Sequence, residues 1–421
     1  MTVLGIDAGT TSLSLARTDG AGRFLDARTC PGEPPDAQRC QDPDAALRLV
    51  LRAMEELPAP DAVAVTGQMH GILYVDAAGR AVSPLYTWQS PLGEAERTPG
   101  ESYARYAARA TGYAAASGYG LVTHLCLSER GELPKNAAKL CTVGDYIAMR
   151  LSGRKTPLLH ASNAASLGFF DLRTRRFDEN ALKTLGIPPE LLPEVTDTVR
   201  ETAQGVFTAV GDNQASFCGA AGGEEGTLLA NVGTGGQLSC LVRGYEECPH
   251  CETRPYNGDA YLLVAASLCG GRAYAVLERF FAETLRAYGV ELSEEEVYAG
   301  MTRMLEGARA LEVDTAFAGT RAEPERRGAV RGISDTNFTP GALAAGVLEG
   351  IAAEFLPAYR TMCARHGFGR LALSGNAARR NPRLRAAFGR LYGLPLAPSA
   401  PPEEAAVGAA RMAAQTIMGT K

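Results

Sequence analysis

The sequence has few aromatic residues, only one tryptophan, and no charge of one sign that dominates. Aromatic residues make up 7% of the chain, and 42 Lys and Arg stand against 47 Asp and Glu, a formal net charge of -5 at pH 7. So small a net negative charge produces no field that would attract a polyanion. We therefore expect no nucleic-acid partner.

Long apolar runs and disulfide spacings are missing too. No apolar run approaches the roughly 20 residues that a membrane-spanning helix needs, and a strand-like segment follows Met1 at once, without the features of an export signal. The ten cysteines show no framework spacing, which favours reduced thiols. We expect a cytoplasmic protein with no membrane partner, and a homodimer is one alternative for its oligomeric state.

Apolar residues and glycine are abundant. The chain has 421 residues, of which 46% are hydrophobic and 47 are glycine. This composition is typical of globular proteins, and the length predicts two or three domains. Abundant glycine favours tight backbone turns that small charged ligands can approach.

The two halves of the chain repeat one order of elements. In each half, three short strands joined by turns precede helical sequence and a strand that returns to the sheet. The expected strands are 3–6, 12–17, 24–29 and 62–66 in the first half and 226–232, 237–242, 260–266 and 370–374 in the second. The expected helices begin at Pro43 and cover 271–287, 340–366, which Pro357 bends, and 402–418. The repeat predicts two α/β domains, 1–222 and 223–421, that close on a nucleotide.

A turn rich in glycine and threonine joins the first two strands of each half. In Asp7-Ala8-Gly9-Thr10-Thr11, Gly9 leaves room for a phosphate against backbone amides, and Asp7 can hold a phosphate-bound Mg²⁺. Gly233-Thr234-Gly235-Gly236 has the same chemistry. Each alone fits an ordinary hairpin turn, but two at equivalent places indicate a triphosphate held from both sides of a cleft. The sequence has neither a P-loop nor a dinucleotide-binding glycine motif.

Two further segments place polar groups where an expected strand ends. Asp212 either caps a helix or accepts the proton of a substrate hydroxyl as that oxygen attacks a phosphoryl group. Gly375 and Asn376 either form a strand-to-helix loop or receive the flat base of a nucleotide. Spacing alone leaves both alternatives open.

Other motifs are less specific. Gln68 and His70 supply the mixed donors and acceptors that polyhydroxylated ligands need, and Trp88-Gln89 offers an apolar face and a polar edge. A lone histidine or tryptophan is nevertheless more often structural. Cys248-Pro249-His250-Cys251 has C-x-x-C spacing but lies in a charged connection between strands, so we expect no redox or metal function there.

Together these motifs resemble those of the FGGY carbohydrate kinases, in the same order and over nearly the whole chain. The matching segments are Asp7-Ala8-Gly9-Thr10-Thr11-Ser12, Gly67-Gln68-Met69-His70-Gly71, Gly211-Asp212-Asn213-Gln214, Gly233-Thr234-Gly235-Gly236 and Ser374-Gly375-Asn376. Within that family, Trp88-Gln89 and the segments that begin at Asn163 and Val264 look most like those of sedoheptulokinases.

The resemblance implies two ribonuclease H-like domains of the actin and hexokinase ATPase type, with a central cleft that binds sugar and Mg-ATP. It implies that Asp212 is the catalytic base and that Asp7 lies near the metal. The implied substrate-binding residues are Gln68, Met69, His70, Trp88, Gln89, Asn163 and Asp212. The implied ATP-binding residues are Gly9, Thr10, Thr11, Gly233, Thr234, Gly271, Gly375 and Asn376.

The function implied is an ATP-dependent ketose kinase that phosphorylates the terminal hydroxyl of sedoheptulose to give the 7-phosphate. Family members usually have Asp directly after the Trp-Gln pair, where this chain has Ser90. A hydroxyl makes fewer and weaker hydrogen bonds than a carboxylate, so another ketose such as xylulose is an alternative substrate. Two alternatives of other classes are a sugar- or nucleotide-binding sensor without turnover and an actin-like ATPase.

Overall fold

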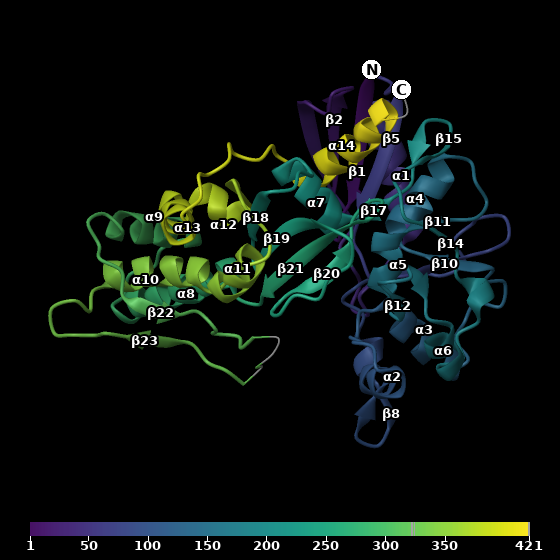
Figure 1. Ribbon diagram of the computed structural model, residues 1–421. Helices are drawn as coiled ribbons and strands as arrows, with labels where there is room; N and C mark the ends of the chain where they lie inside the picture. Colours follow the sequence, from purple (N-terminus) through teal and green to yellow (C-terminus); the bar gives the residue numbers. More distant parts are fainter. Residues whose placement is uncertain (321–322, 324, 420–421) are drawn as a thin grey trace.

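The computed structural model describes residues 1–320, 323 and 325–419, and its two halves each contain a mixed β-sheet with helices beside it (Figure 1). In the first half, β1 (Thr2–Ala8) pairs antiparallel with β2 (Ser12–Asp19), which pairs with β3 (Phe24–Pro31). Helix α1 (Pro43–Glu55) then leads to β5 (Ala62–Gly67), which returns parallel to β1. The sheet is completed beyond β5 by β15 (Glu201–Ala203), β16 (Val206–Phe207) and β17 (Val210–Gly211).

The second half repeats this order. β18 (Thr227–Val232) pairs antiparallel with β19 (Gly236–Arg243), β19 with β21 (Ala260–Ser267), and β24 (Arg370–Ser374) returns parallel to β18. The predicted repeat is therefore confirmed. The sheet also has an edge strand, β20 (Glu252–Pro255), paired with β21. The remaining elements are α8 (Gly270–Ala287), α9 (Glu294–Met304), β22 (Glu312–Asp314), β23 (Ala329–Arg331), α10 (Pro340–Ala353), α11 (Leu356–Cys363), α12 (Asn376–Arg380) and α13 (Pro382–Tyr392).

Between β5 and β15 the chain forms short elements that the sequence did not predict. Several of its strands have only two or three residues, and most pair with a single partner. The elements that precede this region or belong to it are β4 (Cys40–Gln41), β6 (Leu73–Val75), β7 (Leu85–Tyr86), η1 (Pro91–Glu94), β8 (Glu96–Thr98), β9 (Glu101–Ser102), α2 (Tyr103–Thr111), α3 (Gly120–Glu129), β10 (Lys139–Cys141), α4 (Val143–Leu151), β11 (Leu158–His160), α5 (Ala161–Leu167), β12 (Phe170–Asp171), β13 (Arg176–Phe177), α6 (Glu179–Thr184), η2 (Pro189–Leu191) and β14 (Glu194–Thr196).

Helix α14 (Glu404–Gly419), which ends the described chain, lies on the first sheet, although it follows the second sheet in sequence. It contacts β1, β5 and α7 (Asp212–Ala221), and Figure 1 shows it beside β1 and β2. Helix α4 contacts the same sheet, and the middle of β1 is buried on both faces. Two small residues permit the close helix pair, because a Cβ on Gly408 would lie 1.7 Å from the Ala215 carbonyl oxygen and one on Gly219 1.8 Å from that of Glu404. The predicted domain boundary near Gly222 falls where α7 ends and stays a prediction.

One stretch is more apolar than the sequence analysis expected. Residues Pro340–Cys363 form a helical segment that is long and apolar enough to cross a membrane, which corrects the expectation that no such run exists. Two thirds of its most apolar window is buried inside the protein, so it has the character of a core helix. The predicted bend is present, because α10 ends at Ala353 and α11 begins at Leu356, with Pro357 in its first turn.

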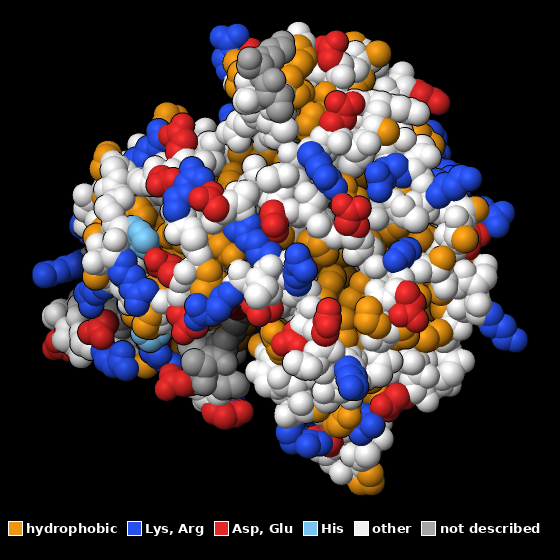
Figure 2. All heavy atoms as spheres, turned by 45° about the vertical axis from the view of Figure 1, so that its right-hand side comes forward, with side chains coloured by type: hydrophobic (Ala, Val, Ile, Leu, Met, Phe, Trp, Pro, Cys, Tyr) orange, Lys and Arg blue, Asp and Glu red, His pale blue; other side chains and the backbone are white. Residues whose placement is uncertain are grey.

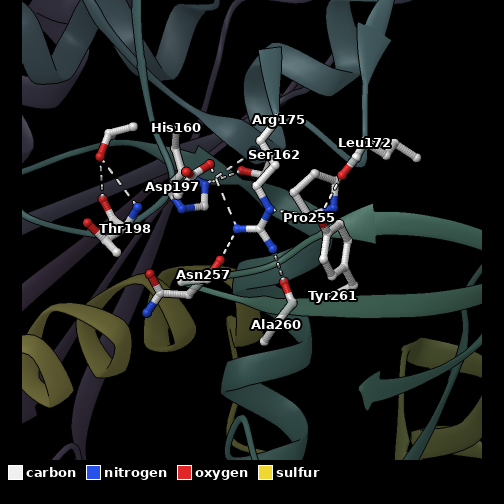
Figure 3. A network of polar contacts seen from close by, with 12 residues as sticks. His160, Ser162, Leu172, Arg175, Asp197, Thr198, Pro255, Asn257, Ala260 and Tyr261 are labelled. Carbon is white, nitrogen blue, oxygen red and sulfur yellow. Dashed lines mark hydrogen bonds and ion pairs between the residues drawn. The ribbon is translucent and has the colours of Figure 1, made fainter. Parts of the chain in front are cut away.

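The two halves are joined by polar contacts around Arg175, at the turn between β12 and β13 (Figure 3). Its guanidinium donates to the Tyr261 hydroxyl at 2.8 Å, to the Ala260 carbonyl at 3.3 Å and to the Gly258 carbonyl. It also lies 4.3 Å from the centre of the Tyr261 ring and pairs with Asp197 at 3.7 Å. On the face shown in Figure 2, basic and acidic side chains are interspersed, without a large patch of one sign.

Candidate active site

Asp7 and Asp212 lie at the same edge of the first sheet because of strand register. On β5, Thr66 is paired with Asp7 of β1 on one side and with Val210 of β17 on the other. Gly211 then ends β17 and is the N-cap of α7, so Asp212 is the first residue of the helix. Because Gly211 occupies the capping position, the alternative in which Asp212 is the N-cap does not match the structure. The edge therefore presents two carboxylates, one on each side of β5.

Both carboxylates hold their protons more tightly than usual. Burial, followed by the negative charges of Asp212 and Glu403, raises the pKa of Asp7 from 3.8 to about 7. Burial also raises the pKa of Asp212 to about 6, although the Asn213 backbone N–H and the charge of Arg254 oppose this effect. Such shifts are typical of functional carboxylates and of sites that bind a cation. A carboxylate with a pKa near neutrality can both accept and release a proton at cellular pH.

The first predicted phosphate turn is a hairpin between β1 and β2. The Gly9 N–H donates to the Ser12 carbonyl at 3.0 Å, and the register places Ala8 opposite Leu13. The Thr11 side chain is exposed, whereas Thr10 is half-buried. The turn thus follows Asp7 directly and keeps Gly9, Thr10 and Thr11 at the edge where Asp212 also lies.

The second predicted phosphate turn is docked on the first residues of α8. Gly271 N–H donates to the Gly233 carbonyl at 2.8 Å and Arg272 N–H to the Thr234 carbonyl at 2.9 Å. A Cβ on Gly271 would lie 2.5 Å from the Gly233 carbonyl oxygen, so only glycine permits this approach. By contrast, nothing lies within 4 Å of the place where a Gly233 Cβ would be. The turn therefore has open space beside Gly233.

Gly375 belongs to the same cluster. It has a φ of 82°, and a Cβ there would lie 2.4 Å from the Val232 carbonyl oxygen. Asn376, whose side chain is exposed, begins α12 directly after it. The structure thus brings Gly233, Thr234, Gly271 and Gly375 together, with Asn376 at their edge; their role in binding adenosine and phosphate stays a prediction.

The predicted sugar-binding segment after β5 lies beside Asp212. Met69 packs against Gly211, since a Cβ on Gly211 would lie 2.6 Å from the Met69 sulfur. His70 has a φ of 70° and is held by Ser166, whose carbonyl oxygen lies 2.7 Å from His70 Nδ1. The His70 ring is stacked on that of Tyr119, with the ring centres 4.9 Å apart. These contacts fix the orientation of the imidazole, which directly follows Met69 in sequence.

Gln68, in the same segment, contacts Gln41. It is 5% exposed, and its Nε2 donates to Gln41 Oε1 at 2.8 Å, while its own Oε1 has no partner among the described residues. Gln41 in turn donates to the Thr10 carbonyl at 2.8 Å. A cavity of about 660 Å³ adjoins them and is lined by 22 residues, among them Gly9, Gln41, Gln68 and Leu49. Gln68 therefore links the sugar segment to the phosphate turn.

In the segment Trp88-Gln89-Ser90, the first two residues are exposed and the third is buried. The Trp88 side chain is 47% exposed, and its Nε1 donates to Thr10 Oγ1 at 3.0 Å. Gln89 is exposed, as a residue that contacts a ligand would be. Ser90 is 1% exposed, and its hydroxyl accepts the Leu92 N–H at 3.4 Å as the cap of η1. The residue that replaces the family's usual Asp is thus used inside the protein.

Asn163 lies behind the site in this structure. It is 2% exposed, and its Nδ2 donates to Asp145 Oδ1 at 3.0 Å and to the Ala209 carbonyl at 3.4 Å. Its neighbour Ser162 accepts the Gly211 N–H at 2.9 Å. The segment therefore supports the backbone that leads into Asp212, and a direct role of Asn163 in sugar binding stays a prediction.

Two residues near the two carboxylates carry no local signal in the sequence. Glu403 raises the pKa of Asp7, and Arg254 lowers that of Asp212, from far along the chain. Such long-range neighbours can be found from one sequence only when the fold is known.

Cys248 and Cys251 are free thiols between β19 and β20. Burial raises the pKa of Cys251, which favours an unreactive thiol. Among the described residues, no group of three or more His, Cys, Asp or Glu side chains is arranged to hold a metal ion.

Comparison with known proteins decides the family. The N-terminal domain of the FGGY family of carbohydrate kinases matches residues 2–229, and the C-terminal domain matches residues 232–417. This chain belongs to the FGGY family of carbohydrate kinases. As an FGGY kinase it is a phosphotransferase that uses ATP to phosphorylate a carbohydrate.

Individual relatives agree with this assignment. The chain is 27% identical to human sedoheptulokinase, over 97% of this chain and 96% of the human protein. It is 29% identical to xylulose kinase from Streptomyces rubiginosus, over 57% of this chain and 54% of that protein. In structure, it is similar to gluconate kinase from Lactobacillus acidophilus, with a TM-score of 0.80, 18% identity and coverage of 100% of this chain and 90% of the other. Xylulose kinase from the same organism gives a TM-score of 0.79, with 19% identity and the same coverage. The predicted actin and hexokinase fold class is confirmed.

Proposed function

We propose that this FGGY kinase transfers the γ-phosphoryl group of Mg-ATP to the terminal primary hydroxyl of a ketose, with sedoheptulose as the preferred acceptor. The observation that carries the proposal is the register that brings Asp7, which precedes the Gly9–Thr11 turn, and Asp212 to one edge of the sheet, with Met69 packed against Gly211. The choice of sugar is supported by the similarity to human sedoheptulokinase, which extends over 97% of the chain.

Asp212 is the proposed catalytic base. As the acceptor hydroxyl oxygen forms its bond to the γ-phosphorus, the bond from that phosphorus to the β–γ bridging oxygen breaks, and ADP leaves. The hydroxyl proton passes to the Asp212 carboxylate. In the loose transition state of phosphoryl transfer, positioning and charge neutralisation matter more than a strong nucleophile. A partly buried carboxylate at a helix start is suited to a proton transfer that occurs late.

The residues present fit a nucleotide-bound Mg²⁺. In kinase sites this ion takes one or two carboxylates and completes its coordination with phosphate oxygens and water. Asp7 lies at the phosphate turn, and the charges of Asp212 and Glu403 disfavour its ionised form. When bound, the ion would neutralise phosphate charge and relieve this repulsion. Gly9, Thr10 and Thr11 would contact the phosphates from one side, with Gly233 and Thr234 on the other.

Xylulose is a second candidate acceptor. The observation that favours it is that Ser90 stands where family members usually have Asp. Because Ser90 is 1% exposed and its hydroxyl accepts the Leu92 N–H, this position offers a sugar less than a carboxylate that points into the site would. The acceptor site therefore lacks the carboxylate that the usual FGGY pattern implies. Loss of one contact weakens discrimination between ketoses of different length.

The test is ADP release with Mg-ATP and a panel of sedoheptulose, xylulose, gluconate and glycerol. We expect sedoheptulose to give the highest kcat/KM and its product to carry a terminal phosphate, as read by phosphorus NMR. Asp212→Asn keeps the shape of the side chain but removes the base, and should lower kcat by about 10²- to 10⁴-fold. Thermal shift with ATP would show that the variant still binds nucleotide.

Each other result has a distinct meaning. A higher kcat/KM with xylulose would replace sedoheptulose with that candidate. Ligand-induced stabilisation without ADP release from any sugar would favour a binding protein without turnover. Full activity of Asp212→Asn would show that this residue is not the base.

A further inference from the structure

Asn213, the residue after the proposed base, is held by two side chains of the second sheet. Arg254 Nη1 on β20 donates to Asn213 Oδ1 at 3.1 Å. Asn213 Nδ2 then donates to Gln237 Oε1 on β19 at 2.7 Å. Asn213 is only partly buried.

The chemistry of arginine gives this chain of hydrogen bonds one direction. A guanidinium has five N–H donors and no acceptor, so the Asn213 atom that faces Arg254 must be the oxygen. The nitrogen of Asn213 must then face Gln237, whose own oxygen accepts it. Without an obligate donor, an Asn side chain can rotate and exchange its oxygen and nitrogen positions. Arg254 therefore determines which end of the Asn213 amide donates and which accepts.

Arg254 is itself well positioned. Its Nε and Nη2 donate to Glu252 Oε2 at 3.2 and 2.7 Å, which leaves Nη1 for Asn213. Its side chain is 21% exposed, and it lies on the strand that packs against α5 of the first half. Both halves of the protein thus meet at Asn213: its helix belongs to the first sheet and its two partners to the second.

We propose that Arg254 is a positioning residue of the acceptor site, which fixes the Asn213 amide beside Asp212 so that its free N–H and its free oxygen lone pair bind hydroxyls of the acceptor sugar. The Asn213 amide uses one N–H on Gln237 and one oxygen lone pair on Arg254, so a second N–H and a second lone pair remain. One donor beside one acceptor matches the two hydroxyls of a vicinal diol. This inference rests on the proposed role of Asp212 in a sugar kinase. It adds that the second sheet takes part in recognising the acceptor as well as the nucleotide.

The test compares Arg254→Met, Arg254→Lys and Asn213→Ala in steady-state kinetics with the preferred sugar. Arg254→Met should raise the sugar KM by about tenfold, the effect of one hydrogen bond to a charged donor, and leave the ATP KM within about twofold. Arg254→Lys also only donates, so it should restore most of the sugar affinity. In the Asn213→Ala background, Arg254→Met should change the sugar KM by less than about twofold.

A matched control is Arg243→Met, which removes an exposed arginine of the same sheet that pairs with Glu225 and Asp259. It should change neither KM. If Arg254→Met proves unstable by thermal midpoint, Arg254→Gln serves instead, since glutamine can donate or accept and releases the constraint on the amide. The proposal is wrong if the effect on sugar KM is as large in Asn213→Ala as in the wild type, or if only the ATP KM changes.

A structural readout separates this proposal from the proposed function. High-resolution crystal structures of the wild type and Arg254→Met should show one amide orientation in the former and a reversed or mixed one in the latter. An unchanged hydrogen-bond pattern around Asn213 would overturn the positioning role, even if the wild type phosphorylates sedoheptulose. Conversely, a wild type that phosphorylates none of the panel sugars would refute the proposed function, whichever orientation the Asn213 amide has in the crystal structures.

Discussion

The indole Nε1 of Trp88 donates a hydrogen bond to the hydroxyl of Thr10 at 3.0 Å. Trp88 belongs to the predicted sugar site and Thr10 to the predicted phosphate turn, and 78 positions separate them in sequence. The two parts of the site are thus joined before any ligand binds. A sugar that orients the indole ring would also orient the threonine of the predicted phosphate turn.

Replacing Trp88 with Phe should therefore weaken ATP binding. The variant keeps an aromatic face for the sugar but loses the donor to Thr10, and we expect the ATP KM to rise by about threefold to tenfold. Steady-state kinetics at saturating sugar measures this change. Thr10→Val removes the acceptor and should have a similar effect, and the double variant should be no worse than either single one. Additive effects would show that the hydrogen bond does not couple the two residues.

The open space at Gly233 allows a direct test of the second phosphate turn. An added methyl group would meet no atom of the protein within 4 Å, so Gly233→Ala should fold with an unchanged thermal midpoint. If the turn cradles phosphate, the methyl group occupies the ligand's place, and the ATP KM should rise by about tenfold or more. Equilibrium titration with ATP would measure the loss directly.

The control for this variant is Gly367→Ala, since a Cβ there would also meet nothing within 4 Å. Gly367 is not one of the predicted nucleotide-binding residues, so its variant should keep wild-type affinity for ATP. Equal affinity of the Gly233→Ala and Gly367→Ala proteins would contradict a phosphate role for the turn.

The strand order in both halves could be predicted because its signals are local. Alternating or buried strands, glycine turns and the Asp42 cap before Pro43 each act within a few residues, and α1 does begin at Pro43 with Asp42 accepting the Asp44 N–H. The two glycine and threonine turns could be located for the same reason, since they join neighbouring strands of each sheet; their role in binding phosphate stays a prediction.

The region between β5 and β15 could not be predicted from such signals. Helix α3 is buried on almost every side, so its sequence lacks the alternation of apolar and polar faces that marks a surface helix. Its neighbours include strands of two or three residues, too short for a clear period and stabilised by tertiary packing. In the site, the influence of Glu403 on Asp7 depends on the position of α14 on the first sheet, which no local pattern encodes.

The raised pKa of Asp7 predicts a gain in stability when its charge is removed. Between pH 4 and pH 7 the folded protein binds a proton at Asp7 that the unfolded chain does not, because its pKa is about 7 in the fold against the usual 3.8. The ionised group therefore destabilises the fold at pH 8, and this cost disappears as the pH falls through 7 towards 4.

Asp7→Asn should accordingly raise the thermal midpoint at pH 8, by an amount that corresponds to about 1 kcal/mol or more. At pH 4.5, where wild-type Asp7 is protonated in the fold and the unfolded chain has begun to bind the proton, the difference between the two proteins should be much smaller. Differential scanning calorimetry at both pH values measures the difference. The same variant should lose most of its kinase activity, since Asp7 is the proposed partner of Mg²⁺. A midpoint that falls at pH 8 would contradict the raised pKa.

The contacts of Arg175 predict that it holds the two halves of the protein together. Its side chain is 11% exposed, and its loss would leave the carbonyls of Gly258 and Ala260 without this donor (Figure 3). Arg175→Met should therefore lower the free energy of unfolding by about 2–4 kcal/mol, which thermal or urea denaturation measures.

Arg173 on the same turn is the matched control for Arg175. It pairs with Glu247, and both side chains are mostly exposed, at 67% and 74%, so Arg173→Met should cost less than about 1 kcal/mol. The comparison isolates the buried hydrogen bonds from the general effect of removing a positive charge from the turn. If both variants shift the unfolding midpoint equally, the contacts of Arg175 with the β20–β21 turn contribute no more than a surface ion pair. A large loss confined to Arg175→Met would show that the β12–β13 turn anchors the second sheet, and with it the strand that carries Arg254, to the first half of the protein.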